Sequence, residues 1–384
     1  MSARWIFLAL LTLLGGVSSN RERDNVLINS LFRTSARLLG NDDAEYSFLS
    51  PFAFASSNAF LDALSSEDGS CQHSQTLEQN SMNEWIAEHL EECFFLEQQF
   101  TMISAVFVQK PLSSPIPSFL TSLIKRQWLR VKISELNYTN ERSEELKKAD
   151  DIIRRLSGVS MSEVFTTDDW NGHTSAVLVT TINYDIRFRL PFKRIETTKK
   201  PFYKSNGSIE FVHMMARTVD GDYKETDDLQ FFAMRLADYS QAFSFFAIVP
   251  KKRFGLQALL DKIQAEDSFF TSLIAGQPLT SHIELEIPTF NVTKLIKVDH
   301  DQFDQANRSS KSFMEPSRTG RIIHQAKFSI TENGIRSVDS PFHLRGLVGF
   351  VDKYEETVRR IELNQPFLYG IYYRDVPMFV GKHC

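Results

Sequence analysis

The spacing of apolar residues in the first half of the chain predicts helices. Apolar positions in residues 24–39 recur with the period of an amphipathic helix. Residues 51–64 predict a second, strongly apolar helix, because a Ser-Pro pair at its start supplies a cap and suits a first turn. Two further helices are expected, an acidic one at 82–97 and a polar one at 141–156.

Later segments are rich in β-branched and aromatic residues, which favours strands. The near-continuous apolar run 175–182 is typical of a central strand that is buried on both faces. Residues 231–236 and 244–249 predict a pair of strands joined by a short turn. The remaining predicted strands are 102–109, 322–331, 367–373 and 378–381. Helices dominate early and strands dominate late, so we expect an α+β fold.

One segment fits neither pattern. Between the strand that ends at Thr331 and the next one near Val358, about 25 residues lack helical or strand periodicity. Loops of this length in compact domains are usually functional or disordered. This one carries large apolar side chains such as Phe342 and Phe350, so its composition differs from that of a simple linker.

The N-terminal residues predict export. Residues 1–19 combine Arg4, a short apolar run and small residues near a cleavage point, as a signal peptide does. We therefore expect a secreted, extracellular chain formed by residues 20–384. An oxidising compartment would permit a Cys71–Cys93 disulfide and leave Cys384 free. Four sequons make the chain a candidate glycoprotein: Asn137, Asn206, Asn291 and Asn307.

Composition and motifs argue against several classes of function. The net charge of -5 gives no general attraction for nucleic acid. No later segment is long and apolar enough to suggest membrane insertion. The sequence lacks a nucleophile elbow, a phosphate-binding loop and a dinucleotide fingerprint. The histidines are scattered without the spacing of a metal site. We therefore expect no enzyme activity, no metal and no cofactor.

Several segments taken in order resemble the serpin family. They are Tyr46-Ser-Phe-Leu-Ser-Pro-Phe52, Phe107-Val-Gln-Lys110, Leu190-Pro-Phe192, Val212-His-Met-Met215, Asn364-Gln-Pro-Phe-Leu368 and Phe379-Val-Gly-Lys382, with His324 ten residues before Gly334. The resemblance covers roughly residues 25–384 and implies one domain with about three β-sheets, about nine helices and an exposed reactive-centre loop. By that resemblance the chain is a serine protease inhibitor, acting as suicide-substrate bait on an extracellular serine protease, and is a monomer.

The resemblance also assigns a hinge and a reactive loop to residues 332–357. In the family a protease cleaves this loop, which then inserts as a new strand of the largest sheet. Here the hinge departs from the family's run of small residues, because it contains Glu332, Gly334, Ile335, Asp339 and Pro341. On insertion Asp339 and Pro341 would point into the core, at a cost in buried charge and a missing N–H donor.

Family spacing places the cleaved bond at Val348-Gly349, with Arg345-Gly346 as the alternative. In the region where the sheet opens, the matching residues are Ala53, Thr180 and His324, of which the first two differ from the family's usual Ser and Asn. Two functions therefore remain open. The chain is either an inhibitor of serine proteases or a non-inhibitory relative that binds a non-protease ligand or protein through the same scaffold.

Overall fold

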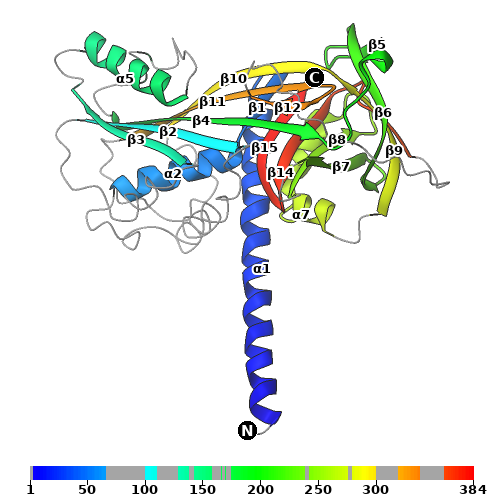
Figure 1. Ribbon diagram of the computed structural model, residues 1–384, viewed down its shortest axis with the longest axis horizontal. Helices are drawn as coiled ribbons and strands as arrows, with labels where there is room; N and C mark the ends of the chain where they lie inside the picture. The colour runs from blue at the N-terminus through cyan, green and yellow to red at the C-terminus, as the bar shows by residue number, and fades with distance from the viewer. Residues whose placement is uncertain are drawn as a thin grey trace.

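The computed structural model shows an elongated β-rich body from which one long helix extends (Figure 1). The structure describes residues 3–65, 100–109, 129–137, 142–157, 166, 169, 174–237, 242–275, 279–299, 319–337 and 359–384.

Five α-helices occur in the described residues, fewer than the about nine that the resemblance implies. They are α1 (Ala3–Gly40), α2 (Pro51–Ser65), α5 (Arg142–Ser157), α6 (Leu256–Ala265) and α7 (Phe269–Ile274). The predicted helices at 24–39, 51–64 and 141–156 are confirmed by α1, α2 and α5. The predicted helix at 82–97 lies outside the described residues.

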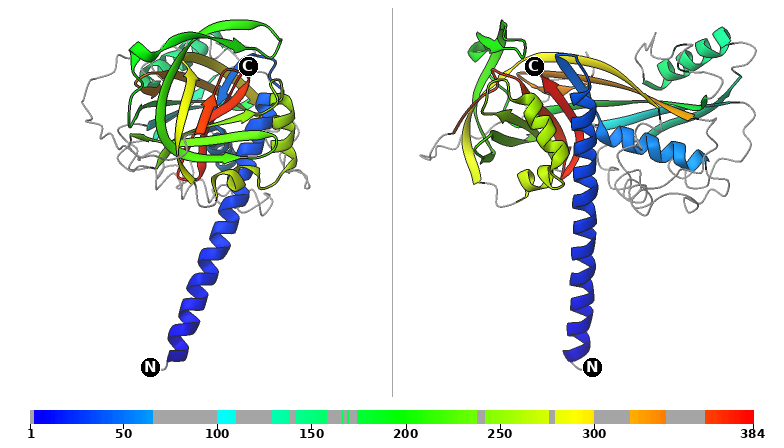
Figure 2. Two further views of the ribbon diagram at one scale, coloured as in Figure 1. Left: turned by 90° about the vertical axis from the view of Figure 1, so that its right-hand side faces the viewer. Right: turned by 180° about the vertical axis from the view of Figure 1, so that it is seen from behind.

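Helix α1 begins far earlier than the predicted start at residue 24, and its N-terminal half extends away from the body (Figures 1 and 2). Its first residues are rich in Leu and Ala, which are strong helix formers, so the helical backbone continues through them. Of the helices searched in the described part of the chain, none combines the length and the apolar character that crossing a membrane requires.

The largest group of paired strands forms the long horizontal sheet in Figure 1. Its order is β3-β2-β4-β11-β10, with the short strand β12 between one end of β4 and β11. Their bounds are β2 (Phe100–Gln109), β3 (Leu129–Leu136), β4 (Thr174–Phe188), β10 (Phe290–Asp299), β11 (Thr319–Thr331) and β12 (Gly334–Arg336).

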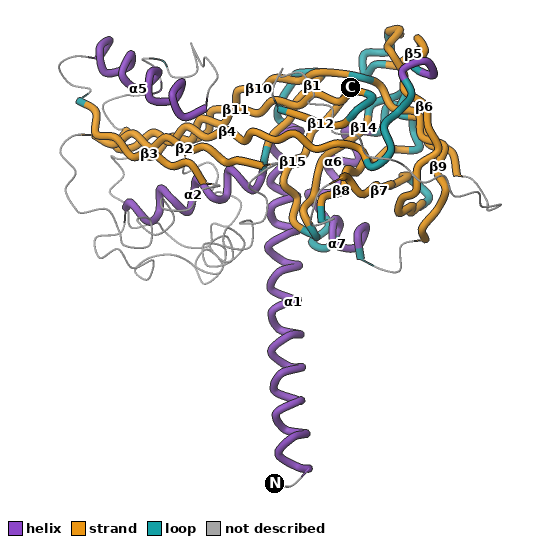
Figure 3. Tube along the Cα trace, viewed as in Figure 1, coloured by secondary structure: helices purple, strands orange, loops and turns teal. Residues whose placement is uncertain are grey.

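Strand β4 is buried on both faces, which confirms the prediction for residues 175–182. Val177 and Val179 pack in a small cluster under α5, whereas Leu178 between them packs in the main core. Successive side chains of a strand point to opposite faces, so a strand covered on both sides needs apolar residues at every position. The layers lie above and below the sheet in Figure 3, with α5 on one face and α2 on the other.

The other strands form two smaller groups. One has the order β1-β15-β14-β8-β7-β6 and the other the order β5-β6-β9-β13, so β6 belongs to both. Their bounds are β1 (Tyr46–Leu49), β5 (Thr198–Tyr203), β6 (Ile209–Glu225), β7 (Leu229–Ala237), β8 (Phe243–Pro250), β9 (Leu279–Pro288), β13 (Arg359–Glu362), β14 (Phe367–Tyr373) and β15 (Val376–His383). The predicted pairing of 231–236 with 244–249 is confirmed by β7 and β8.

Aromatic side chains fill the core between the strand groups. Phe48 of β1 lies 4.8 Å from Phe328 of β11 and 5.9 Å from Tyr369 of β14, measured between ring centroids. Tyr184 of β4 lies 4.6 Å from Phe379 of β15 in the same way. One connected hydrophobic cluster therefore runs from α1 to the last strand, which ties the large sheet to the smaller groups.

Candidate functional site

Within the segment 332–357, residues 334–336 form a strand rather than a loop. Strand β12 pairs with both neighbours, antiparallel to β4 and to β11. Ile335 lies opposite Ile186 of β4 and Ile330 of β11. The expectation of a loop from residue 332 onward is thus corrected for 334–336, because the strand edges on both sides supply backbone partners that sequence periodicity does not reveal. Residues 338–358 lie outside the described part.

The side chains of this segment alternate between the core and the outer face. Ile335 is 0% exposed and Ser337 is 6% exposed. The N–H of Ser337 donates to the carbonyl oxygen of Tyr184 at 2.9 Å, and the N–H of Tyr184 donates to the Ser337 hydroxyl at 2.8 Å. The gap between β4 and β11 is therefore filled as far as Ser337.

Gly334 allows the chain to enter this gap. Its φ is +155°, and a Cβ at this position would lie 2.4 Å from the carbonyl oxygen of Ile186 and 2.6 Å from the Cα of Arg187. Both contacts are with backbone atoms, which cannot turn away as a flexible side chain can. A glycine is required here by the close approach of β4.

Replacing Gly334 by alanine is expected to displace β12 from the gap. Exposing Ile335 would then cost about 2–3 kcal/mol of stability. Hydrogen exchange at the amides of 334–337 and chemical denaturation should both report the loss. Gly40→Ala is the matched control, because the atoms nearest to its added Cβ are side-chain ends at 3.7 Å and 3.8 Å. Unchanged exchange in Gly334→Ala would contradict the assignment.

The base of β12 is held by the last residue of β4 and by the segment that follows it. The N–H of Phe192 donates to the carbonyl oxygen of Glu332 at 2.8 Å, and the N–H of Phe188 donates to that of Asn333 at 3.1 Å. The Thr197 hydroxyl donates to the Glu332 carboxylate at 3.0 Å. Sequence reasoning missed Thr197, because nothing in the spacing of the chain places it beside Glu332.

Beyond the gap, β4 and β11 pair directly with each other over Thr174–Thr181 and Thr319–Gln325, with His324 opposite Thr180. The Nε2 atom of His324 accepts the N–H of Ser50 at 3.1 Å, and burial lowers the pKa of His324 to about 4, so its ring is neutral. The hydrogen bond from Ser50 to His324 therefore joins the start of α2 to the region where β4 and β11 pair directly, which we call the seam.

The three residues predicted for the sheet-opening region do gather here. The N–H of Ala53 donates to the Ser50 hydroxyl at 3.1 Å, so Ala53 belongs to the cap of α2. The hydroxyls of Thr180 and Ser104 lie 3.3 Å apart. Ser50 and Ser104 complete the seam, and sequence analysis did not assign either to it. Ser104 has no motif around it, whereas Ser50 belongs to the helix cap and to the family motif 46–52.

The structure describes the other predicted site residues only in part. Asn206 and Asn291 are exposed, Asn137 is half-buried, and Cys384 is buried with a free thiol. The following lie outside the described residues: Cys71, Cys93, Asn307, Asp339, Pro341, Arg345, Gly346, Val348 and Gly349. In the part of the chain that the structure describes, no three His, Cys, Asp or Glu side chains converge as metal ligands would.

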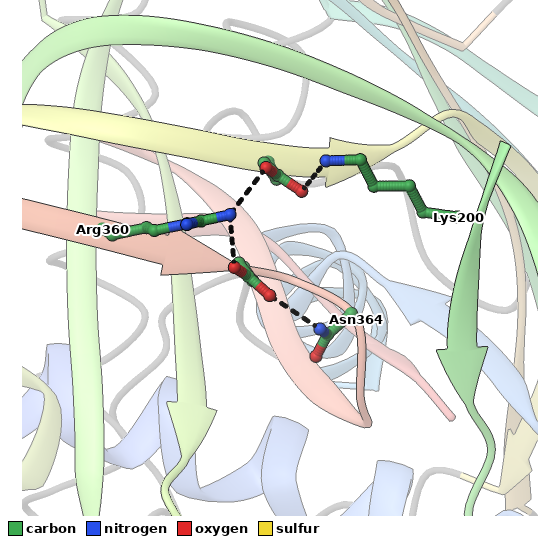
Figure 4. Close-up of polar contacts among 5 residues, drawn as sticks. Lys200, Arg360 and Asn364 are labelled. Carbon is green, nitrogen blue, oxygen red and sulfur yellow. Dashed lines mark hydrogen bonds and ion pairs between the residues drawn. The ribbon is translucent and has the colours of Figure 1, made fainter. Parts of the chain in front are cut away.

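Strand β13 takes part in a polar network (Figure 4). Arg360 of β13 lies 3.3 Å from Glu286 of β9 and 2.8 Å from Glu362, while Lys200 of β5 lies 2.7 Å from Glu286. The Asn364 amide donates to Glu362 at 3.0 Å. Charged side chains of β9 and β5 thus form a network with those of β13. The backbone of β13 pairs only with β9 in the described residues.

Comparison with known proteins defines the class to which this arrangement belongs. The family described as "Serpin (serine protease inhibitor)" matches residues 30–384, so the chain belongs to the serpin family. Mouse Serpin B13 is 21% identical over 67% of each chain, and human Serpin B3 is 19% identical over 64% of each. A serine protease inhibitor of Cyanea capillata is 22% identical over 66% of this chain and 68% of its own length.

Solved structures share the fold at low identity. Serpin48 of the insect Tenebrio molitor superimposes with a TM-score of 0.72 at 14% identity, covering 94% of this chain and 96% of its own. AtSerpin1 of Arabidopsis, described as the native stressed conformation, gives 0.70 at 14% identity, with 94% and 98% covered. The serpin fold is therefore confirmed.

Proposed function

We propose that the protein is a secreted serpin-type inhibitor of serine proteases in which the trapping step is slow. Residues 338–357 act as bait, and a protease that cleaves them is trapped when the loop continues β12 between β4 and β11. The protein needs no catalytic centre for this role, because the protease supplies the chemistry. The observation that carries the proposal is β12 itself, three residues of the new strand that already lie in the gap.

The register of β12 supports the proposal that trapping is slow. Since Ile335 lies opposite Ile186 and Ile330, continuing the strand would place Asp339 opposite Ile182 and Ala326. Both of those residues are buried and neither offers a partner to a carboxylate. Asp339 would have to enter the core unpaired or protonated, which costs several kcal/mol.

Two residues further along, the same register would place Pro341 opposite Thr180 and His324. Proline has no N–H to donate to a neighbouring strand, and it is generally confined to edges and bulges. The insertion must also separate β4 from β11 at this point, because the two strands pair directly there. Both costs arise early in the remaining insertion, because Asp339 and Pro341 are the next inward-facing residues after Ser337.

Three parts of the proposal rest on the sequence. The signal-peptide pattern of residues 1–19 supports export and an extracellular target, and the sequons support glycosylation. Asn206 and Asn291 are exposed, as carriers of a glycan must be.

A panel of trypsin-, chymotrypsin- and elastase-like proteases tests the proposal. We expect an SDS-stable covalent complex with at least one of them, accompanied by a larger amount of cleaved, untrapped protein. Mass spectrometry of the released C-terminal peptide would separate cleavage at Val348-Gly349 from cleavage at Arg345-Gly346. Cleavage without any complex across the panel would rule out inhibition.

The second candidate is a non-inhibitory serpin that binds a ligand or protein partner through the same scaffold. The predicted positions of Asp339 and Pro341 favour it, because they oppose completion of the strand. It predicts that cleavage of the loop raises the melting temperature only slightly. A rise of tens of degrees after cleavage would count against this candidate and in favour of complete insertion.

A further inference from the structure

The outer face of the hairpin formed by β5 and β6 carries apolar side chains in contact with water. Successive side chains of a strand point to opposite faces, and an antiparallel pair with one face on the core usually has polar residues on the other. The buried Phe202 and Met214 mark the inner face. The register assigns six residues to the outer face, which we call the tip face: Lys199, Pro201, Tyr203, Ile209, Phe211 and His213.

Two large apolar side chains of the tip face are mostly exposed. Ile209 is 57% exposed and Phe211 is 67% exposed. The turn after β8 adds to this surface, because the guanidinium carbon of Arg253 lies 4.0 Å from the centroid of the Tyr203 ring. Phe254, the next residue, is 54% exposed. Three of the five large apolar side chains that are exposed in the described residues thus belong to this region, so exposed apolar surface is concentrated here.

The β5–β6 hairpin lies at one end of the body, away from the N-terminal end of α1 (Figures 1 and 2). Its backbone is held in place by hydrogen bonds. The N–H of Lys204 donates to the carbonyl oxygen of Ser208 at 2.9 Å across the turn, and the N–H of Tyr203 donates to that of Asn364 at 2.8 Å. Side chains on a backbone that is already fixed lose less conformational freedom on binding than those of a mobile loop.

The charge around the tip face is positive. Glu210 belongs to the opposite face of the hairpin and pairs with Lys204 at 3.0 Å. No tip-face residue is acidic, whereas Lys252 and Arg253 in the neighbouring turn are both exposed. A second copy of the chain would bring the same positive charge to the contact, so this occupant is disfavoured. The surface of a bilayer with anionic headgroups is complementary both to the apolar side chains and to the charge.

We propose that the tip face binds to the surface of a lipid bilayer that contains anionic lipids. Ile209 and Phe211 enter the boundary between headgroups and acyl chains, while Tyr203 lies at the headgroup level, where amphipathic rings are favoured. Arg253 stays among the headgroups and attracts them. No segment crosses the bilayer in this mode of binding. The proposal does not depend on whether the loop traps a protease.

Co-sedimentation of the full-length protein with vesicles of phosphatidylcholine and phosphatidylserine tests the proposal. The variant I209S/F211S should bind on the order of 100-fold more weakly, since each apolar side chain kept out of the bilayer contributes about tenfold. K252A/R253A should lose roughly tenfold on these vesicles and nothing on vesicles of phosphatidylcholine alone. In Phe211→Trp, the emission of the added indole should shift to shorter wavelength when vesicles are added, because the ring leaves water.

Val26→Ser is the matched control, because Val26 is 56% exposed but lies on α1. It should bind vesicles as the unmodified protein does. All variants should melt near the same temperature, because the replaced side chains are exposed. Absence of vesicle binding by the unmodified protein would overturn the proposal. Equal binding by I209S/F211S would also overturn it, because the attraction would then be to charge alone.

A glycan on Asn206 would lie at the turn of the same hairpin. Ser208→Ala removes that sequon but keeps the hydrogen bond from the backbone N–H of residue 208 to Oδ1 of Asn206, at 2.9 Å. This variant should bind vesicles at least as tightly as the unmodified protein, since no sugar can then separate the hairpin from the lipid. Weaker binding by Ser208→Ala would contradict the placement of the hairpin against the bilayer.

Discussion

The double variant D339A/P341A is expected to trap proteases far more efficiently than the unmodified protein. At pH 7, neutralising an aspartate with an ordinary pKa near 3.9 costs roughly 4 kcal/mol. An acceptor left without a proline N–H adds about 1–3 kcal/mol. Removing both costs should raise the fraction of cleaved protein that forms covalent complex at least tenfold, as measured by gel densitometry under denaturing conditions.

The control for this variant lies in the same segment. Asp352→Ala removes a carboxylate downstream of both candidate cleavage bonds, so it lies in a part that does not insert. It should leave the trapped fraction unchanged. If D339A/P341A also left that fraction unchanged, the costs at these two residues would not be what limits insertion, and the slow-trapping proposal would fail.

Acid should destabilise the protein well above the range in which carboxylates titrate. Burial lowers the pKa of His324 to about 4 and that of His383, with a smaller effect of Lys204, to about 3. Unfolded histidine has a pKa near 6.5, so the unfolded chain binds more protons as the pH falls below that value. The sign is therefore a loss of stability from about pH 6.5 downward. At pH 5 the two residues together should remove roughly 4 kcal/mol.

Denaturation midpoints at pH 7 and pH 5 measure this loss. His383→Phe should reduce the difference between the two pH values by about half, because only His324 would then remain to be charged. His383 already packs among rings, at 4.3 Å from Phe290 and 4.8 Å from Phe202 between centroids, so a phenyl group suits its surroundings. An unchanged difference would show that His383 is not buried in its neutral form.

The central strand and the pairing of β7 with β8 could be predicted because their evidence is local. The run 175–182 is apolar at every position, and one short turn joins 231–236 to 244–249. Helix α1 was predicted too short, since a signal-peptide pattern and a helical pattern are both rich in leucine. Periodicity alone predicted only the α+β class. The serpin fold was predicted from the family resemblance.

The site was less predictable because its contacts join distant parts of the chain. The family resemblance assigned Gly334, Ile335 and His324, but the position of β12 depends on the edges of two strands, more than 140 residues away in the case of β4. Thr197 contacts Glu332 across 135 residues, and Ser104 contacts Thr180 across 76. Such neighbours leave no periodic trace in the sequence.

The position of β12 has a kinetic consequence. Starting a new strand within a sheet is normally the slow part, because the chain must lose freedom before any bond repays it. In this molecule that nucleus already exists, with Ile335 and Ser337 seated in the core. What remains is to extend the strand residue by residue, which requires the direct pairing between β4 and β11 to be broken. Insertion of a cleaved loop would therefore need no nucleation step. Its rate would be set by the first residue that is costly to place in the sheet.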